Sequence, residues 1–229
     1  MLPGVPGKGL PMLPFSETWR TALWLCAGAA AFLFGERLAI RYGAGALVRR
    51  WVGLPAGGLV ALGCAARFGG VQAVLALIAC ALLYALGRVD AATMVLPDPL
   101  CALLGLLALP WVLAAWLGGA AWGPLLFEHT VSAMTISLPL ALLRRVWPGC
   151  LGGGDVKFLA AAGLWLGWAV VPAFLLATLA AGAWSVAGVA AGRLRPGVQF
   201  AFGPFLCAAA VVALFGSEEF IGWFYGGML

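Results

Sequence analysis

The chain has 229 residues, of which 64% are hydrophobic and 9% charged. A soluble domain carries about 25% charged residues, so this composition excludes one and indicates a polytopic membrane protein. The formal net charge is +5, from 13 Lys and Arg against 8 Asp and Glu. In a membrane chain such cations determine topology, so we expect contacts with membrane lipids and no nucleic acid partner.

The apolar stretches predict an all-α fold, a polytopic integral membrane helical bundle. A spanning helix needs roughly 20 apolar residues. On that criterion we expect about eight transmembrane helices, although two short stretches leave six or seven open. The predicted spans are 19–38, 52–67, 71–88, 98–117, 124–144, 156–170, 173–192 and 199–216. No repeat or separable soluble module interrupts them, so we predict a single domain over residues 1–229.

The Lys and Arg residues predict the side of the membrane on which each loop lies, because loops rich in these cations stay cytoplasmic. If the loops alternate sides, ten of the 13 cations fall on one side and three on the other. The first side collects Arg37, Arg41, Arg49, Arg50, Arg88, Arg144, Arg145, Lys157, Arg193 and Arg195, and the other has Lys8, Arg20 and Arg67. We therefore expect the first side to be cytoplasmic.

Cysteine and histidine usage gives no sign of a metal centre. None of the six cysteines forms a C-x-x-C pair, and five lie inside apolar runs, which is typical of small apolar core residues. The single histidine, His129, lies near the outer end of the fifth predicted span, and we expect an interfacial or helix-packing role for it. No H-E-x-x-H motif is present. We predict no metal and no cofactor.

Three aspartates lie in or beside loops assigned to the cytoplasmic side. Asp90 ends the third predicted span, where the helix dipole disfavours negative charge, so its presence there calls for a function. Asp98 follows Pro97 at the start of the next span, where a first-turn acid is favoured on structural grounds alone. Asp155 begins the sixth span and is either functional or a helix N-cap. Two carboxylates that share a proton can act as base and acid in peptide hydrolysis.

The segment GGGDVK at 152–157 stands between two long apolar runs. Its glycines, Gly152, Gly153 and Gly154, allow close approach of the backbone and let Asp155 adjust its position. Lys157 is typical of a positive-inside anchor, with contact to a lipid headgroup or a substrate as the alternative. We expect these four residues and Asp98 to support or position a substrate at the site.

Three ordered segments resemble the type IV prepilin peptidases, which are aspartic proteases of the G-x-G-D type. They are DAATMVLPD at 90–98, GGGDVKFLAAAGLWLG at 152–167 and FGPFL at 202–206. The resemblance covers about residues 72 to 216. It implies an aspartic endopeptidase of the bacterial inner membrane with Asp90 and Asp155 as the catalytic pair.

The resemblance also implies substrates: prepilins or pseudopilins, cut between a positively charged leader and the hydrophobic helix on the cytoplasmic side, for pilus assembly or type II secretion. The loop after the first span lacks the cysteines of the family's zinc module, so we predict a peptidase without N-methyltransferase activity. We further expect the two aspartates to face each other across a water-accessible cleft. Two alternatives remain open: a transporter that uses the carboxylates for ions or protons, or a catalytically inactive assembly scaffold.

Overall fold

The computed structural model describes residues 15–45, 50–148, 152–195 and 199–216, together with residues 222 and 226; of residues 15–18 and 50–52 only the backbone is described. Within these ranges every regular element is helical, which confirms the all-α prediction. The helices are α1 (Phe15–Arg41), α2 (Arg50–Arg67), α3 (Gly70–Thr93), α4 (Asp98–Leu106), α5 (Ala108–Leu117), α6 (Trp122–Val146), α7 (Gly153–Leu166), the 3₁₀ helix η1 (Gly167–Ala169), α8 (Val170–Ala190) and α9 (Gly203–Phe215).

Every predicted span overlaps at least one of these helices. Among the described residues, five stretches are long and apolar enough to cross a membrane: Trp19–Arg41, Gly70–Thr93, Asp98–Leu117, Trp122–Val146 and Gly153–Ala190. These confirm a multi-pass membrane bundle. Helices α2 and α9 are not among the five, so the count of eight spans stays a prediction.

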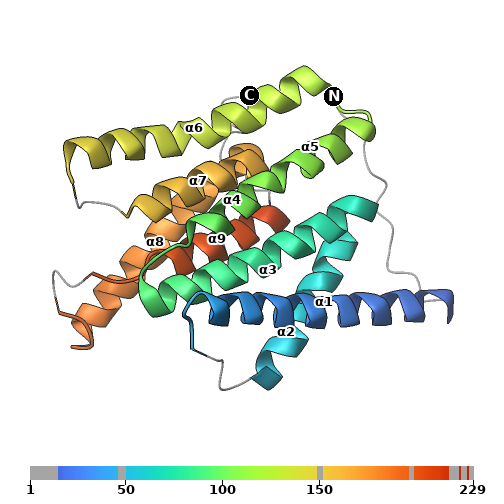
Figure 1. The fold of residues 1–229 in the computed structure, drawn as a ribbon, viewed down its shortest axis with the longest axis horizontal. Helices are drawn as coiled ribbons and strands as arrows, with labels where there is room; N and C mark the ends of the chain where they lie inside the picture. The colour runs from blue at the N-terminus through green and yellow to red at the C-terminus, as the bar shows by residue number, and fades with distance from the viewer. Residues whose placement is uncertain are drawn as a thin grey trace.

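The predicted boundary between the sixth and seventh spans differs from the structure by a few residues. We expected the break near Pro172, but α7 already ends at Leu166. Gly167 has a φ of 60°, a left-handed conformation that glycine adopts at little cost. Pro172 lies in the first turn of α8, where its missing N–H breaks no helical hydrogen bond. Figure 1 shows the chain turning back at this point, so that α7 and α8 run in opposite directions.

One predicted span, 98–117, is divided in the structure. Helix α4 ends at Leu106 and α5 begins at Ala108, with Leu107 between them. Pro110 lies in the first turn of α5 and has no N–H to donate to the carbonyl of Leu106. Proline is a usual cause of a helix kink, so Pro110 accounts for the division between α4 and α5.

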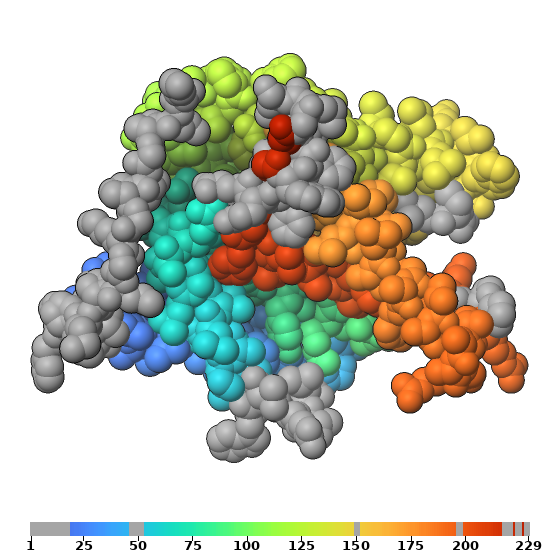
Figure 2. Space-filling view, turned by 180° about the vertical axis from the view of Figure 1, so that it is seen from behind, coloured from blue at the N-terminus to red at the C-terminus, as the bar shows by residue number. Residues whose placement is uncertain are grey.

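Helix α3 is the central element of the bundle. It packs against α1, α2, α4, α5 and α9. Its core-facing side chains are mostly alanine and leucine, including Ala76, Leu82, Leu83 and Leu86, which are fully buried. Seen from behind, α9 lies between α2 and α8 (Figure 2), and it contacts both.

The α6–α7 contact uses the polar residues near the middle of α6. His129 is buried, and its Nδ1 lies 2.9 Å from the carbonyl oxygen of Leu164. Ser132 donates to the carbonyl oxygen of Gly163 at 3.0 Å. The predicted helix-packing role of His129 is thus confirmed.

Several helix ends that carry charge meet at one end of the bundle, on the left in Figure 1. There α1, α3 and α6 end and α4, α7 and α9 begin; we call this the aspartate end. Arg41 is in the last turn of α1, and Arg144 and Arg145 are in the last turn of α6. Asp98 and Asp155 lie in the first turns of α4 and α7. Residues far apart in the sequence are thereby gathered.

Candidate active site

Asp90 lies near the C-terminal end of α3 and is only 5% exposed. Its Oδ2 accepts a hydrogen bond of 2.8 Å from the main-chain N–H of Gly203, the first residue of α9. The first N–H groups of a helix have no partner within the helix, and the helix dipole makes this end attractive to negative charge. The C-terminal end of α3 disfavours the negative charge of Asp90, and the N-terminal end of α9 therefore offsets this cost.

The start of α9 also closes over Asp90. A Cβ placed on Gly203 would lie 2.6 Å from Oδ2 of Asp90 and 2.8 Å from its Cγ, so only glycine fits there without displacement. The water-accessible cleft that we expected at Asp90 is therefore wrong for this conformation. Sequence spacing could not show this closure, because Asp90 and Gly203 are 113 residues apart.

Asp155 is the third residue of α7 and is partly exposed. Gly152 is the N-cap residue of this helix, which excludes the cap position for Asp155. The carboxylate instead reaches back to the backbone of Gly152. A side chain at the third helical position commonly makes this reciprocal contact with the cap residue.

The glycines before Asp155 allow close packing by lacking a side chain, and none of them adopts a backbone conformation that only glycine favours. Gly152 has an extended conformation, Gly153 and Gly154 are helical, and none of the three has a positive φ. A Cβ on Gly154 would lie 2.8 Å from the Cβ of Leu96, which is buried ahead of α4. A Cβ on Gly153 would meet only the guanidinium of Arg144, at 2.7 Å. Gly154 therefore sets how closely α7 approaches the segment before α4.

The helices that carry the two predicted catalytic carboxylates meet at the aspartate end. Asp90 lies near the end of α3, and Asp155 lies in the first turn of α7. Two buried cysteines, Cys101 of α4 and Cys207 of α9, lie within the first two turns of helices that begin there. The aspartate end thus contains both carboxylates and two buried thiols.

Asp98 and Lys157 form an ion pair at the aspartate end. The Nζ of Lys157 lies 2.5 Å from Oδ2 of Asp98, and the two side chains are 57% and 64% exposed. The pair joins the first turn of α4 to the first turn of α7. Both residues therefore lie at the aspartate end, with side chains that are more than half exposed.

Sequence reasoning overlooked two features near the site. The segment FGPFL was noted, but its Gly203 was not assigned to the contact with Asp90. The second feature is Glu36 of α1, which is 3% exposed, accepts a hydrogen bond of 2.7 Å from Tyr84 and pairs with Arg88 at 3.4 Å. An acidic residue within an apolar run was the available signal, since such residues are costly in a membrane.

The arrangement suits acid–base chemistry between two carboxyl groups. Nearby like charges favour a state in which one carboxyl is protonated and the other ionised. Such a pair can take a proton from water and give one to a carbonyl oxygen. Among the described residues, no group of three His, Cys, Asp or Glu side chains is placed to hold a metal ion.

Comparison with known proteins identifies relatives of this helical membrane protein. The model of the type IV leader peptidase family matches residues 76–187, which include both Asp90 and Asp155. The leader peptidase HopD of Salmonella typhimurium is 36% identical over 132 residues, which are 56% of this chain and 83% of that protein. The chain belongs to the type IV leader peptidase family.

Longer relatives match as well. The prepilin leader peptidase/N-methyltransferase of Burkholderia pseudomallei is 37% identical over 171 residues, covering 72% of this chain and 54% of the relative. The protein of that name from Legionella pneumophila is 31% identical over 177 residues, covering 68% and 54%. The chain thus spans about half the length of these two relatives. No solved structure matches it significantly.

Proposed function

We propose that the chain is an aspartic endopeptidase that removes the leader peptide of type IV prepilins or pseudopilins at the cytoplasmic side of the bacterial inner membrane. The observation that supports the proposal is that Asp90, near the C-terminal end of α3, and Asp155, in the first turn of α7, come from different helices and lie at the same end of the bundle. Family membership supports it, because relatives are named as prepilin leader peptidases. The role would serve pilus assembly or type II secretion.

In the proposed reaction one carboxylate accepts a proton from a water molecule, whose oxygen attacks the scissile carbonyl carbon. The other carboxyl group donates its proton to the carbonyl oxygen. The C–N bond then breaks as the first carboxyl group gives the proton it took from water to the leaving amine, and the second carboxylate regains a proton from the diol hydroxyl. Neither step needs a covalent intermediate. Before substrate binds, the hydrogen bond from Gly203 holds the carboxylate of Asp90 in one orientation.

The closure over Asp90 gives this mechanism a structural requirement. Water and a peptide carbonyl must reach Oδ1 or Oδ2 of Asp90, which is 5% exposed in this conformation. The segment at the start of α9 is the part that covers it. Substrate binding is therefore expected to move the beginning of α9 relative to α3.

The charge distribution supports the proposed sidedness. Positively charged residues of loops and helix ends gather on the cytoplasmic side of bacterial membrane proteins. Arg41, Arg144, Arg145 and Lys157 all lie at the aspartate end. A leader peptide that remains in the cytoplasm would then reach the aspartates without crossing the membrane.

Asp98, Lys157 and the glycines have supporting roles in this proposal. The Asp98–Lys157 pair joins α4 to α7 at the aspartate end. Gly154 permits the close approach of α7 to Leu96 and so sets the depth of Asp155. We propose that the chain lacks N-methyltransferase activity and acts as a peptidase only.

Incubation of the purified chain in detergent with a prepilin that carries its leader, followed by mass spectrometry, tests the proposal. The wild-type chain is expected to release the leader, whereas Asp155→Asn leaves the prepilin intact. The product mass shows whether a methyl group has been added. An intact prepilin with the wild-type chain, under conditions in which a related leader peptidase cleaves it, contradicts the proposal and favours a transporter or an inactive scaffold.

A further inference from the structure

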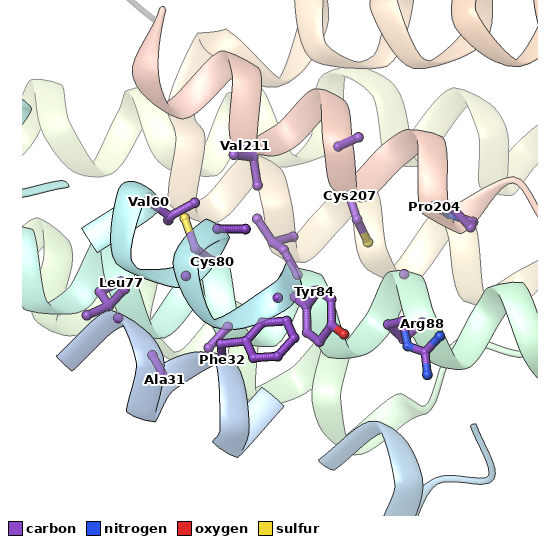
Figure 3. Close-up of a pocket in the computed structure, with 18 of the residues that line it drawn as sticks. Ala31, Phe32, Val60, Leu77, Cys80, Tyr84, Arg88, Pro204, Cys207 and Val211 are labelled. Atoms are coloured by element: carbon purple, nitrogen blue, oxygen red, sulfur yellow. The ribbon is translucent and has the colours of Figure 1, made fainter. Parts of the chain in front are cut away.

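A large apolar groove lies between α1, α2, α3 and α9. Its volume is about 1130 Å³, above the range of about 300 to 1,000 Å³ usual for pockets that hold small molecules. Figure 3 shows Leu77 toward one end of it and Arg88 and Pro204 toward the other. Leu77 and Arg88 are eleven positions apart on α3, which corresponds to about 16 Å along a helix.

The walls of the groove are made largely of small residues from four helices. They include Ala31 of α1, Ala56 of α2, Ala81 of α3 and Ala208 of α9. In membranes, small side chains mark surfaces where another helix approaches closely, because association there depends on packing and not on a hydrophobic driving force. The shape and lining therefore fit a helix better than a compact ligand.

One end of the groove reaches the neighbours of the catalytic residue. Ala91 and Pro204 line the groove, and they directly follow Asp90 and Gly203 in the sequence. A chain lying in the groove would thus leave it next to the covered carboxylate. This continuity links the groove to the reaction proposed above.

The same end is polar, unlike the rest of the groove. Tyr84 and Arg88 line it, and both interact with the buried carboxylate of Glu36. The Nε–H of Arg88 is buried and has no hydrogen-bond partner among the described residues. Within a membrane, a backbone that leaves the helical conformation needs new hydrogen-bond partners. A donor at this end suits the point at which a bound helix unwinds.

We infer that this groove seats the apolar helix that follows the cleavage point of the substrate, with its N-terminal end at Arg88 and Asp90. The inference rests on the proposed function and adds the place at which the substrate binds. The helix packs against the alanine walls, and its first residues unwind at the polar end. The scissile bond then lies beside the start of α9.

Site-specific photocrosslinking tests the inference in the full chain. Ala208 is exposed and lines the groove, whereas Ala180 of α8 is exposed and does not line it. A photoreactive amino acid is placed at each position in an Asp155→Asn background, which holds the substrate uncleaved. Crosslinking to a prepilin is expected at position 208 and not at 180, and excess unlabelled prepilin should abolish it.

A filling variant provides the second measurement. Ala208→Trp adds a large side chain to the groove and should lower kcat/KM for a prepilin roughly tenfold or more, mainly through KM. Ala180→Trp is the matched control and should cleave at the wild-type rate.

The outcomes separate the two proposals. If the wild-type chain cleaves, but crosslinking at 208 is absent or equal to that at 180, or Ala208→Trp cleaves normally, the groove is a lipid-filled surface and the inference is overturned. If the wild-type chain cleaves no prepilin, the proposed function itself fails and the assignment of the groove fails with it.

Discussion

The main-chain N–H of Gly203 donates a 2.8 Å hydrogen bond to Oδ2 of Asp90 and joins the end of α3 to the start of α9. The contact gives a buried carboxylate both a hydrogen-bond donor and the positive end of a helix dipole. It also places the FGPFL segment at the candidate active site. The third sequence element of the family resemblance thus has a physical role: it holds and covers an aspartate.

Gly203→Ala should impair cleavage strongly, because the added Cβ would lie 2.6 Å from the carboxylate oxygen that it must accommodate. We expect a loss of roughly tenfold or more in kcat/KM, from displacement of Asp90 or of the start of α9. The prepilin cleavage assay measures it. Gly182→Ala is the control, since a Cβ at Gly182 of α8 would meet no atom of the described residues within 4 Å outside its own stretch of helix. Equal activity of the two variants would show that the Gly203 contact is dispensable.

Asp90→Asn should abolish cleavage with the folded protein retained, because the amide cannot exchange a proton as a carboxyl group does. Asp98→Asn removes a comparable charge from the same end of the bundle, but from a side chain that is 64% exposed and paired with Lys157. It should keep measurable activity. Mass spectrometry of the prepilin, with detergent size-exclusion profiles of each variant, makes the comparison. Cleavage by Asp90→Asn at near the wild-type rate would remove Asp90 from the catalytic pair.

Gly154→Ala and Gly153→Ala form a matched pair of variants. They test whether the glycines are needed for close helix packing or for backbone flexibility. At Gly154 the new methyl group collides with the Cβ of Leu96, so we expect a loss of about 1 to 3 kcal/mol in stability. At Gly153 it meets only the end of the Arg144 side chain, which can move away, and the better helix propensity of alanine offsets the change. Thermal unfolding in detergent and the cleavage assay provide the readouts. If both variants lost activity without loss of stability, the glycines would act as a hinge.

Arg88→Met should destabilise the bundle, because it removes the ion pair that Arg88 makes with the buried carboxylate of Glu36. The Glu36 side chain is 4% exposed and that of Arg88 is 27% exposed. Removal of one partner from a buried pair costs about 3 kcal/mol or more. The double variant Glu36→Gln with Arg88→Met should recover part of the loss, since no charge is then left buried. Thermal unfolding in detergent tests this, with Arg193→Met at an exposed position as the control. Equal melting temperatures for Arg88→Met and the wild type would contradict the prediction.

The Asp98–Lys157 pair should contribute little to stability despite its short distance. Both side chains are more than half exposed, and exposed ion pairs are worth about 0 to 1 kcal/mol. A double-mutant cycle with Asp98→Asn and Lys157→Met measures the coupling between them. The coupling should weaken as salt is added. A coupling above about 2 kcal/mol would mean that the pair is less solvated than its exposure indicates.

The sequence by itself determined the fold class and most helix positions, and it predicted the two aspartates as candidates, for one physical reason. In a membrane, apolar length specifies helices directly, and a carboxylate within an apolar chain is costly enough to stand out. The first-turn position of Asp98 also followed from local rules, because Pro97 and the helix dipole act over only a few residues. The predicted break between α7 and α8 was placed too late in the chain, near Pro172. A proline in the first turn of a helix cannot be told, from sequence alone, from a proline that ends the helix before it.

Only the tertiary structure decided what surrounds those residues. Three contacts depend on segments that are distant in sequence. They are the hydrogen bond from Gly203 to Asp90, the packing of Leu96 on Gly154, and the ion pair between Glu36 and Arg88. The same contacts decided that Asp90 is covered, where we had expected an open cleft. Packing between helices in a membrane is determined by the shapes of small residues over whole faces. No local pattern in the sequence contains that information.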